Sequence, residues 1–469
     1  MIPVSLSWIA EQVNGQLVAQ QQSDLIISGV STDTRSIQPK DVFLALSGPN
    51  FDGHKFVQQA EEKGAVALIL SRQVDTSLPY ILVEDTKLAL GLLGAAVKAK
   101  VAPKTVGITG SSGKTTVREM VVAILSRRGK VLATKGNLNN DLGVPMTLLR
   151  LEQEHEFAVI EMGANHLGEI AYTTNLVQPD VVTIVNAAAA HLEGFGSLFG
   201  VARAKSEIFK GLSEKHGLAV VNADSQFAEY WLGKLKYNQV QSFSSEKQAD
   251  VYAQDIILGL DGCAQFELVT PKGRIGISLA LPGAHNVNNA LVAAALSLHV
   301  GATLQDISEG LRSMSGVQGR LNVKQLTNQV KIIDDSYNAN VGSVNAAIDL
   351  LSSFAGRKIL ILGDMAELGE KARFYHAQVG EYAQQKGIDK LYTLGVLSQS
   401  ASDVFASNGR HFSGLEQMVE FINQQTLGEK CDVSILVKGS RSARMELVVK
   451  ALEDSPLGKL ERFRESIAC

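Results

Sequence analysis

The chain has 469 residues, too many for one ordinary hydrophobic core, and this length suggests about three domains. Its 45% hydrophobic and 20% charged residues are typical of a globular protein and exclude a largely disordered one. The formal net charge of −4 provides no basic field for nucleic acid, and three widely separated cysteines favour neither a disulfide framework nor a cysteine-based zinc site.

The first residues, MIPVSLSWIAEQV, lack the basic and long apolar regions of a secretory signal. Apolar runs such as AVALIL and KILILG are as long as strands, well short of the roughly 20 residues that a membrane-spanning helix needs. We therefore expect a cytoplasmic protein with no integral membrane segment, and we expect it to act as a monomer that does not bind nucleic acid.

Residues 1–100 contain short strand-like runs, among them LIISGVSTD, DVFLALSG and YILVED, and a few helical ones. This mixture predicts a small α/β recognition domain without an evident catalytic nucleophile. The following segment KAKVAPK, residues 98–104, is predicted to be a linker.

The run VGITGSSGKTT, residues 106–116, predicts a phosphate-binding loop between a strand and a helix. Its glycines carry no Cβ atom, so backbone N–H groups can approach phosphate oxygens at the positive end of the helix. Lys114 would reach the β- and γ-phosphates, and the Thr115 hydroxyl would ligate magnesium. The alternative is a glycine-rich turn with an ordinary surface lysine. The predicted nucleoside triphosphate contacts are Gly110, Ser111, Ser112, Gly113, Lys114, Thr115 and Thr116.

From about residue 105 to 321, apolar strands such as TVGITG, FAVIEMG and VVTIVN alternate with helical stretches. This alternation predicts a doubly wound parallel sheet with the phosphate-binding loop at the carboxyl end of its first strand. After Arg320 the alternation restarts with VKIIDD, KILILGD, KLYTLG and SILVKGS. The chain is therefore predicted to hold three α/β domains, over residues 1–100, 101–321 and 322–469, the last one Rossmann-like.

Polar residues stand near the ends of the predicted strands. Glu161 ends the buried run FAVIE, so its carboxylate would emerge beside the phosphate-binding loop as a magnesium ligand or as a solvated carboxylate. His191 follows another strand, although a lone histidine is more often a core or surface residue. Lys205 lies on a predicted helix whose ordinary interpretation is a solvated basic face. The loop GNLNNDLGVP offers amide groups, either for binding or for turn formation.

Together these motifs resemble the Mur ligases, ATP-dependent amide-forming enzymes of bacterial peptidoglycan precursor synthesis. The family pattern is matched by GSSGKTT, EMGAN, Asn186 with His191, Lys205, HNVNN and the late Gly319-Arg320. Further stretches are similar to the branch that adds D-alanyl-D-alanine: STDTR, FDGH, GNLNNDLGVP, AHLEGFGS, IDDSYNAN, LGDMAELG and VKGSRSARME. Two departures, Lys40 for a usual glycine and Val341 for a usual proline, touch no expected ligand.

The resemblance implies that the first domain binds a UDP-linked substrate, the second binds ATP and the third brings the incoming amine. It implies ATP contacts from Asn286, Arg320, Asp335 and Asn338. It implies catalytic roles for Lys114, Glu161, His191 and Lys205, and two magnesium ions held by Thr115, Glu161, His191 and Lys205 as a carbamate. The implied substrate contacts are Ser31, Thr34, Arg35, Asp52, Gly53, His54, Asn137, Asn139 and Asn140.

The activity implied by the resemblance is ATP-dependent joining of D-alanyl-D-alanine to UDP-N-acetylmuramoyl-tripeptide through an acyl phosphate. Phosphoryl transfer needs positioning and charge neutralisation, so the lack of a protein nucleophile is consistent with this activity. Among enzymes, the alternatives are a sibling that adds a single amino acid and a folylpolyglutamate synthase. From another class, the alternative is a P-loop ATPase switch that binds a partner protein.

Overall fold

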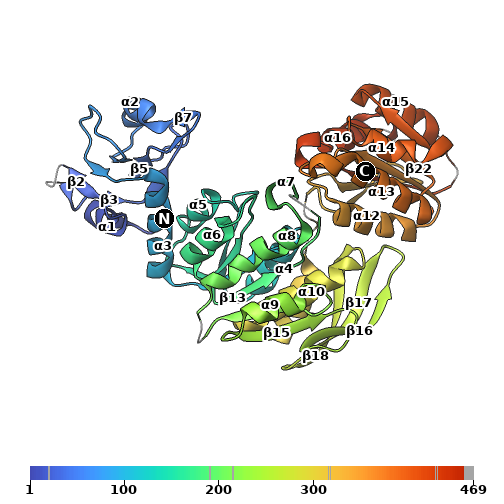
Figure 1. The fold of residues 1–469 in the computed structure, drawn as a ribbon, viewed down its shortest axis with the longest axis horizontal. Helices are drawn as coiled ribbons and strands as arrows, with labels where there is room; N and C mark the ends of the chain where they lie inside the picture. The colour runs from blue at the N-terminus through green and yellow to red at the C-terminus, as the bar shows by residue number, and fades with distance from the viewer. Residues whose placement is uncertain are drawn as a thin grey trace, which may run out of the picture.

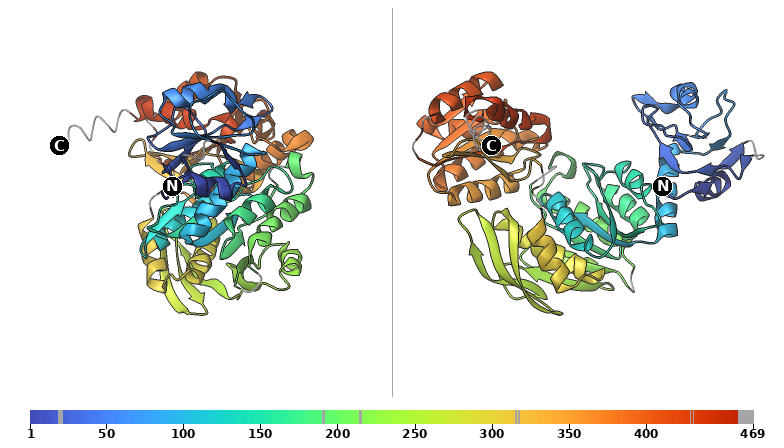
Figure 2. Two further views of the ribbon diagram at one scale, coloured as in Figure 1. Left: turned by 90° about the vertical axis from the view of Figure 1, so that its left-hand side faces the viewer. Right: turned by 180° about the vertical axis from the view of Figure 1, so that it is seen from behind.

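The computed structural model describes residues 1–458 except 19–21, 190, 191, 214, 215, 315, 317, 428 and 430. Three larger sheets follow one another along the chain, each with its own helices (Figure 1). The N-terminal and C-terminal domains stand at opposite ends of the molecule and the middle domain joins them, as the reverse view in Figure 2 also shows. The predicted three-domain α/β architecture is therefore confirmed. No helix in the described parts of the chain is long and apolar enough to span a membrane.

The N-terminal domain has a five-stranded sheet with the order β2-β9-β8-β5-β4, in which only β2 runs antiparallel. Its strands are β2 (Gln16–Val18), β4 (Gly29–Ser31), β5 (Asp41–Leu44), β8 (Ala67–Leu70) and β9 (Tyr80–Leu82), with two smaller pairs, β1 (Val4–Ser5) with β3 (Ile26–Ile27) and β6 (Ser47–Gly48) with β7 (Phe51–Asp52). Its helices are α1 (Leu6–Gln12), η2 (Gly53–Phe56), α2 (Val57–Glu62) and α3 (Thr86–Val101).

Helix α3 runs through most of the segment that was predicted to be a linker. It ends at Val101, Ala102 takes a left-handed conformation with φ 53°, and β10 starts at Lys104. The Lys98 ammonium donates to the carbonyl of Gln178 in the middle domain, so this last turn is docked. The linker prediction for residues 98–104 was wrong, because Lys98 and Lys100 belong to helix α3, Lys104 begins β10, and only Ala102 and Pro103 interrupt regular structure.

The middle domain has a nine-stranded sheet with the order β11-β12-β10-β13-β14-β15-β16-β17-β18. Its strands are β10 (Lys104–Thr109), β11 (Lys130–Ala133), β12 (His155–Glu161), β13 (Val181–Ile184), β14 (Leu218–Asn222), β15 (Gln239–Ser244), β16 (Val251–Leu258), β17 (Cys263–Thr270) and β18 (Gly273–Pro282). Its helices are α4 (Lys114–Leu125), α5 (Gly143–Leu148), α6 (Glu169–Val177), α7 (Leu192–Phe195), α8 (Leu198–Lys205), η3 (Ser206–Gly211), α9 (Ala228–Lys234), α10 (His285–His299) and α11 (Leu304–Ser313).

Strands β10 to β16 are parallel, as the alternation predicted, whereas β17 and β18 extend the sheet in antiparallel fashion. The predicted parallel sheet is therefore confirmed for β10 to β16, and β17 and β18 are an antiparallel extension that the sequence analysis did not predict. Along β17 the even-numbered residues from Ala264 to Thr270 are buried and their neighbours are more exposed. This period of two is typical of an antiparallel strand with one covered face.

The C-terminal domain has a six-stranded sheet with the order β19-β20-β24-β21-β22-β23, and only β19 runs antiparallel. Its strands are β19 (Asn322–Gln325), β20 (Val330–Asp335), β21 (Arg357–Gly363), β22 (Lys390–Leu394), β23 (Gly409–Phe412) and β24 (Val433–Lys438). Its helices are α12 (Val341–Ser353), η4 (Gly369–Lys371), α13 (Ala372–Gln385), α14 (Gln399–Asp403), η5 (Ala406–Asn408), α15 (Leu415–Thr426), η6 (Arg441–Ala443) and α16 (Glu446–Asp454).

The core of the middle domain holds helix α4, which begins at the predicted phosphate-binding loop. The alanine-rich helix α10 is buried along almost its whole length and packs against α4. Helix α11 approaches α4 so closely that a Cβ atom on Gly310 would lie 2.7 Å from the Cα atom of Ile124. This close approach requires a glycine and fixes the axis of α4.

We predict that Gly310→Ala lowers the free energy of unfolding of the middle domain by about 1–3 kcal/mol, because backbone atoms of α4 must shift to admit the methyl group. The control is Gly233→Ala in α9, where a Cβ atom meets nothing within 4 Å. That variant should gain about 0.5–1 kcal/mol from helix propensity. Thermal unfolding of both variants tests this, and equal melting temperatures would contradict it.

Candidate active site

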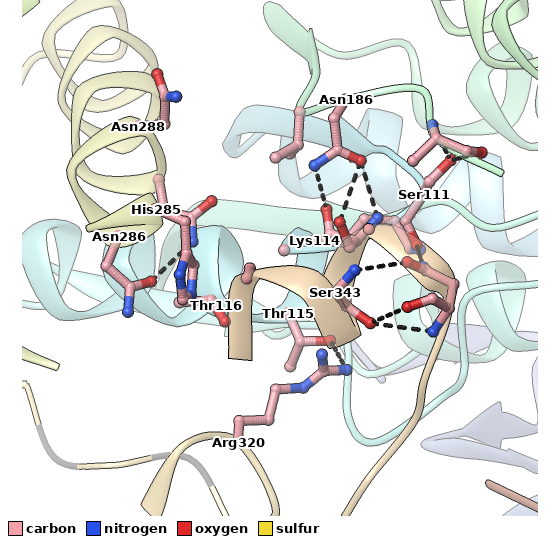
Figure 3. Close-up of a pocket in the computed structure, with 18 of the residues that line it drawn as sticks. Ser111, Lys114, Thr115, Thr116, Asn186, His285, Asn286, Asn288, Arg320 and Ser343 are labelled. Atoms are coloured by element: carbon pink, nitrogen blue, oxygen red, sulfur yellow. Dashed lines mark hydrogen bonds between the residues drawn. The ribbon is translucent and has the colours of Figure 1, made fainter. Parts of the chain in front are cut away.

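A cavity of about 370 Å³ lies where the middle and C-terminal domains meet (Figure 3). It brings together all but one of the predicted ATP contacts, namely Ser111, Ser112, Gly113, Lys114, Thr115, Thr116, Asn286, Arg320, Asp335 and Asn338. Gly110 is not among the lining residues, although its carbonyl accepts a hydrogen bond from the Lys114 ammonium at 2.7 Å. The cavity also has polar residues to which the sequence analysis gave no role, including Asn222 and Ser343 outside the quoted motifs and Asn288, Asn289 and Lys438 within them.

The glycine loop follows β10 and turns directly into α4. Gly113 has a φ of 77°, in the left-handed region that favours glycine. A Cβ atom there would also lie only 2.9 Å from the side-chain oxygen of Asn289 on α10. Both backbone conformation and space therefore require glycine at this position, and the first N–H groups of α4 point toward the cavity without intrahelical partners.

Asn186 holds the loop from the neighbouring strand. It lies just after β13, next to β10 in the sheet, and its side-chain oxygen accepts from the Ser112 N–H at 2.9 Å. Its amide nitrogen donates back to the Ser112 carbonyl at 3.1 Å, while its own carbonyl accepts from the Ser111 N–H at 3.0 Å. These bonds fix the loop relative to β13.

Glu161 ends β12, the strand on the other side of β10. Its buried carboxylate accepts from the Thr115 hydroxyl at 3.1 Å and from the Asn139 amide at 2.9 Å. Arg118, one turn further along α4, lies 3.3 Å from the same carboxylate. The alternative of a solvated carboxylate is therefore wrong, and Thr115 and Glu161 present neighbouring oxygen atoms, which suit a hard cation such as magnesium.

Burial lowers the pKa values of two lysines near the glycine loop, Lys114 and Lys205. Burial lowers the pKa of Lys114, and Glu161 offsets part of this effect. Lys205, at the end of α8, is only 2% exposed, so the interpretation as a solvated basic face is wrong. Burial and then the nearby charge of Lys114 hold the pKa of Lys205 well below its ordinary value, which favours a neutral amine.

The predicted metal ligand His191 lies outside the described residues. The structure therefore places Thr115, Glu161 and Lys205 near the glycine loop but gives no position for the fourth member of the predicted set. Within the described residues, no group of three or more histidine, cysteine, aspartate and glutamate side chains forms a metal site.

The C-terminal domain faces the loop with residues from two adjacent strands. Asp335 ends β20 and pairs in register with Lys438 at the end of β24, and the two side chains form a buried ion pair. The Lys438 ammonium also donates to the carbonyl of Asn338 at 3.0 Å. Burial lowers the pKa of Lys438, and Asp335 opposes that shift.

Arg320 crosses from the domain junction to the glycine loop. Its guanidinium lies 4.5 Å from the centre of the Tyr337 ring and donates to the Thr115 hydroxyl at 3.2 Å. The residues before and after it, Gly319 and Leu321, both have positive φ values, 70° and 51°. The junction thus turns sharply and aims Arg320 into the cavity (Figure 3).

The predicted substrate contacts of the N-terminal domain gather at the carboxyl edge of its sheet, away from the cavity. Ser31 ends β4 and accepts from the Asp33 N–H, while Thr34 donates to the side chain of Gln59 at 2.8 Å. Arg35 is exposed and forms an ion pair with Asp33 in the same loop. Asp52, Gly53 and His54 follow β5 and form a second group at this edge.

The three asparagines of the loop GNLNNDLGVP have different environments. Asn139 bonds to Glu161, and its carbonyl accepts from the N–H of Gly163 at 2.8 Å. Asn140 is exposed and accepts from the N–H of Gly143, which is turn formation at the start of α5. Asn137 is exposed beside Gly136. The structure therefore brings only Asn139 into the network around the glycine loop.

The sequence analysis assigned no individual role to Arg118, Tyr337 or Lys438. Arg118 could have been suspected from its place one turn after the loop lysine, on the same helix face. Tyr337 and Lys438 lie in the motifs IDDSYNAN and VKGSRSARME, but the pairing of Lys438 with Asp335 depends on a strand order that spacing alone does not reveal.

Three family models match the chain: the Mur ligase family catalytic domain over residues 26–110, the Mur ligase middle domain over 108–297, and the Mur ligase glutamate ligase domain over 319–441. The chain is similar to the UDP-N-acetylmuramoyl-tripeptide--D-alanyl-D-alanine ligase of Escherichia coli strain K12, with 47% identity over 456 residues, covering 97% of this chain and 99% of that relative.

Two solved structures extend this similarity to the fold. A crystal structure of MurF from Acinetobacter baumannii has a TM-score of 0.91 and 39% identity, covering 97% of this chain and 99% of that one. The structure of MurF ligase from Thermotoga maritima in complex with ADP has a TM-score of 0.82 and 29% identity, covering 92% of this chain and 98% of that one.

We predict that Asn186→Ala weakens nucleotide binding about tenfold or more, because the glycine loop loses its hydrogen bonds to β13 and must be ordered by the ligand. Calorimetric titration with ADP measures this, and Asn328→Ala, at an exposed amide between β19 and β20, is the control. If Asn186→Ala binds ADP as tightly as the unmodified protein does, the hydrogen bonds of Asn186 do not position the loop.

Proposed function

Because the chain belongs to the Mur ligase family, we propose that it is an ATP-dependent ligase that joins D-alanyl-D-alanine to UDP-N-acetylmuramoyl-tripeptide. The reaction class rests on one observation above all, the cavity in which the glycine loop meets Arg320 and Asp335 of the next domain. The proposed substrates are those of relatives that match nearly the whole chain. The activity is the amide-forming step that adds a dipeptide to a peptidoglycan precursor.

The three domains divide the substrates among them. Residues 1–100 hold the UDP end of the precursor, residues 101–321 hold ATP, and residues 322–469 bring the dipeptide and close over the nucleotide. The glycine loop, Asn286 and Arg320 line one cavity with Asp335 and Asn338, which supports a nucleotide site shared by the last two domains. We propose that the active form is a monomer.

The reaction proceeds in two steps. A terminal carboxylate oxygen of the tripeptide attacks the γ-phosphorus of ATP, the bond to the β–γ bridging oxygen breaks, and ADP leaves. The amine of D-alanyl-D-alanine then attacks the acyl carbon, the carbon–oxygen bond to phosphate breaks, and the nitrogen loses a proton. A carboxylate alone is a poor acylating group, so activation must come before amide formation.

The protein groups act mainly by position and charge. Lys114, which bonds to the Gly110 carbonyl in the structure, turns to the β- and γ-phosphates when nucleotide is present. The Arg320 guanidinium donates to the Thr115 hydroxyl, so its positive charge also lies beside the place proposed for the phosphates. The acyl phosphate hydrolyses readily in water, so the covering of the loop by the C-terminal domain protects it.

The residues near the loop fit magnesium. Thr115 and Glu161 offer adjacent hydroxyl and carboxylate oxygens, and they would hold one ion, with His191 and carbamylated Lys205 holding a second. Magnesium bound there supplies positive charge that the phosphates and the reacting carboxylate require. Because the reaction consumes ATP and a nucleotide-linked precursor, we place the enzyme in the cytoplasm.

Lys205 is suited to carbamylation. Its burial favours the neutral amine, which adds to carbon dioxide, forms a nitrogen–carbon bond and releases a proton. The product is an anion in a place where Lys114 supplies an uncompensated positive charge. The modification therefore turns a repulsive pair of lysines into an attractive one.

We predict that purified enzyme releases phosphate only when ATP, UDP-N-acetylmuramoyl-tripeptide and D-alanyl-D-alanine are all present. A coupled phosphate assay with each substrate omitted in turn checks this. Single amino acids or glutamate accepted in place of the dipeptide would instead indicate a sibling ligase or a folylpolyglutamate synthase. Steady hydrolysis of ATP alone would indicate the P-loop switch.

We predict that enzyme equilibrated with ¹³C-bicarbonate shows a carbamate carbon resonance that Lys205→Ala abolishes. Lys205→Arg keeps a positive charge but cannot be carbamylated, so it should lose activity on the order of a hundredfold or more. Lys210→Ala, at an exposed lysine of the same segment, is the control and should keep both signal and activity. An active Lys205→Arg variant would rule out the carbamate.

A further inference from the structure

We propose that Phe51 and Phe56 form the surface on which the uracil base of the UDP-linked substrate stacks. The inference rests on the proposed function, because it takes the substrate of the N-terminal domain to carry a uracil base. It adds a base-binding site to that domain, where the sequence motifs point only to polar residues for the diphosphate.

The two rings lie against each other and are both partly open to solvent. Their centroids lie 5.6 Å apart with an interplanar angle of 14°, so they are stacked. Phe51 is 50% exposed and Phe56 is 39% exposed. A single exposed phenylalanine is ordinary on a protein surface, but an exposed pair of stacked rings can be extended by a further planar group on an outer face. A planar base is a fitting occupant, because every base has a face that stacks on aromatic rings.

The backbone between the two rings is held rigidly. The Gly53 N–H donates to the Leu46 carbonyl at 2.7 Å, and a Cβ atom on Gly53 would lie 2.7 Å from the same oxygen. His54 is buried, and its Nε2 accepts from the Ser71 N–H at 3.0 Å. Nδ1 therefore carries the proton and donates to Asp52 at 2.8 Å. The rings flank a fixed segment, so little ordering is needed when a base binds.

Cations lie near this surface to receive the phosphates. Arg72 is half exposed and bonds to Asp52, which directly follows Phe51. Arg35 and Lys55 are exposed at the same carboxyl edge of the sheet. The strand β7, which carries Phe51, lies on the side of the N-terminal domain that faces the rest of the molecule (Figure 1). A base on the rings would thus leave the peptide end of the substrate free to extend toward the middle domain.

The test is steady-state kinetics with Phe51→Ala and Phe56→Ala. Each variant should raise the KM for UDP-N-acetylmuramoyl-tripeptide about tenfold, as expected for the loss of a base-stacking contact. The kcat at saturating substrate and the KM for ATP should stay within about twofold, because the nucleotide cavity is untouched. Phe51→Tyr should keep the KM of the unmodified enzyme, whereas Phe51→Leu should raise it, since stacking needs a ring.

Two controls separate stacking from a structural effect. Phe374→Ala removes a similarly exposed ring, 59% exposed, from the C-terminal domain and should leave every constant unchanged. Inhibition by uridine monophosphate and by ribose 5-phosphate compares ligands with and without the base. The unmodified enzyme should prefer the uridine compound, and Phe51→Ala should lose that preference.

Unchanged KM values in both alanine variants, or a retained preference for uridine monophosphate, would overturn the proposal. A raised KM that Phe51→Tyr does not restore would also overturn it, because that result indicates a structural role. Failure of the unmodified enzyme to form product would instead contradict the proposed function, so the two failures are distinguishable.

Discussion

The hydrogen bonds between Asn186 and Ser112 fix the phosphate-binding loop, and the rest of the site is placed relative to that loop. The glycines that let a phosphate approach contribute no side chains that could hold the shape of the loop. The strand order β12-β10-β13 supplies the support, with Glu161 on one side and Asn186 on the other. Close packing of α10 and α11 against α4 then fixes the helix that the loop begins.

An excess of buried positive charge is the second constraint. Lys114, Arg320 and Lys438 line the cavity, and Asp335 forms an ion pair with Lys438. Burying a cation is unfavourable, and burial lowers the pKa values of Lys114, Lys205 and Lys438. A triphosphate brings negative charge to these basic side chains, which favours nucleotide binding.

Much of the site could be predicted from sequence because parallel strands end at one edge of a sheet. The segments after β10, β12 and β13 carry the glycine loop, Glu161 and Asn186, and their adjacency follows from the fold class. The pairing of Asp335 with Lys438 could not be predicted, since it depends on β24 lying beside β20. The burial of Lys205 could not be predicted either, because the sequence of a short helix shows no pattern that separates a buried lysine from an exposed one.

The wrong predictions have similar causes. The segment at residues 98–104 looks like a linker because it is rich in lysine, yet Lys98 reaches across to the middle domain and its helix is docked. The antiparallel end of the middle sheet was missed because the sequence analysis assigned no strands to β17 and β18, although β17 shows the alternation of an antiparallel strand with one covered face. The docking of α3 was missed because it depends on a tertiary contact, which local composition does not record.

The central claim is that the tripeptide carboxylate is activated by phosphoryl transfer from a nucleotide held by this loop. The most direct measurement uses tripeptide substrate with ¹⁸O in its terminal carboxylate and follows the label by mass spectrometry after complete turnover. We predict that one labelled oxygen moves into inorganic phosphate while ADP is formed. Phosphate without label, or label in AMP, would contradict an acyl phosphate and with it the assigned role of the site.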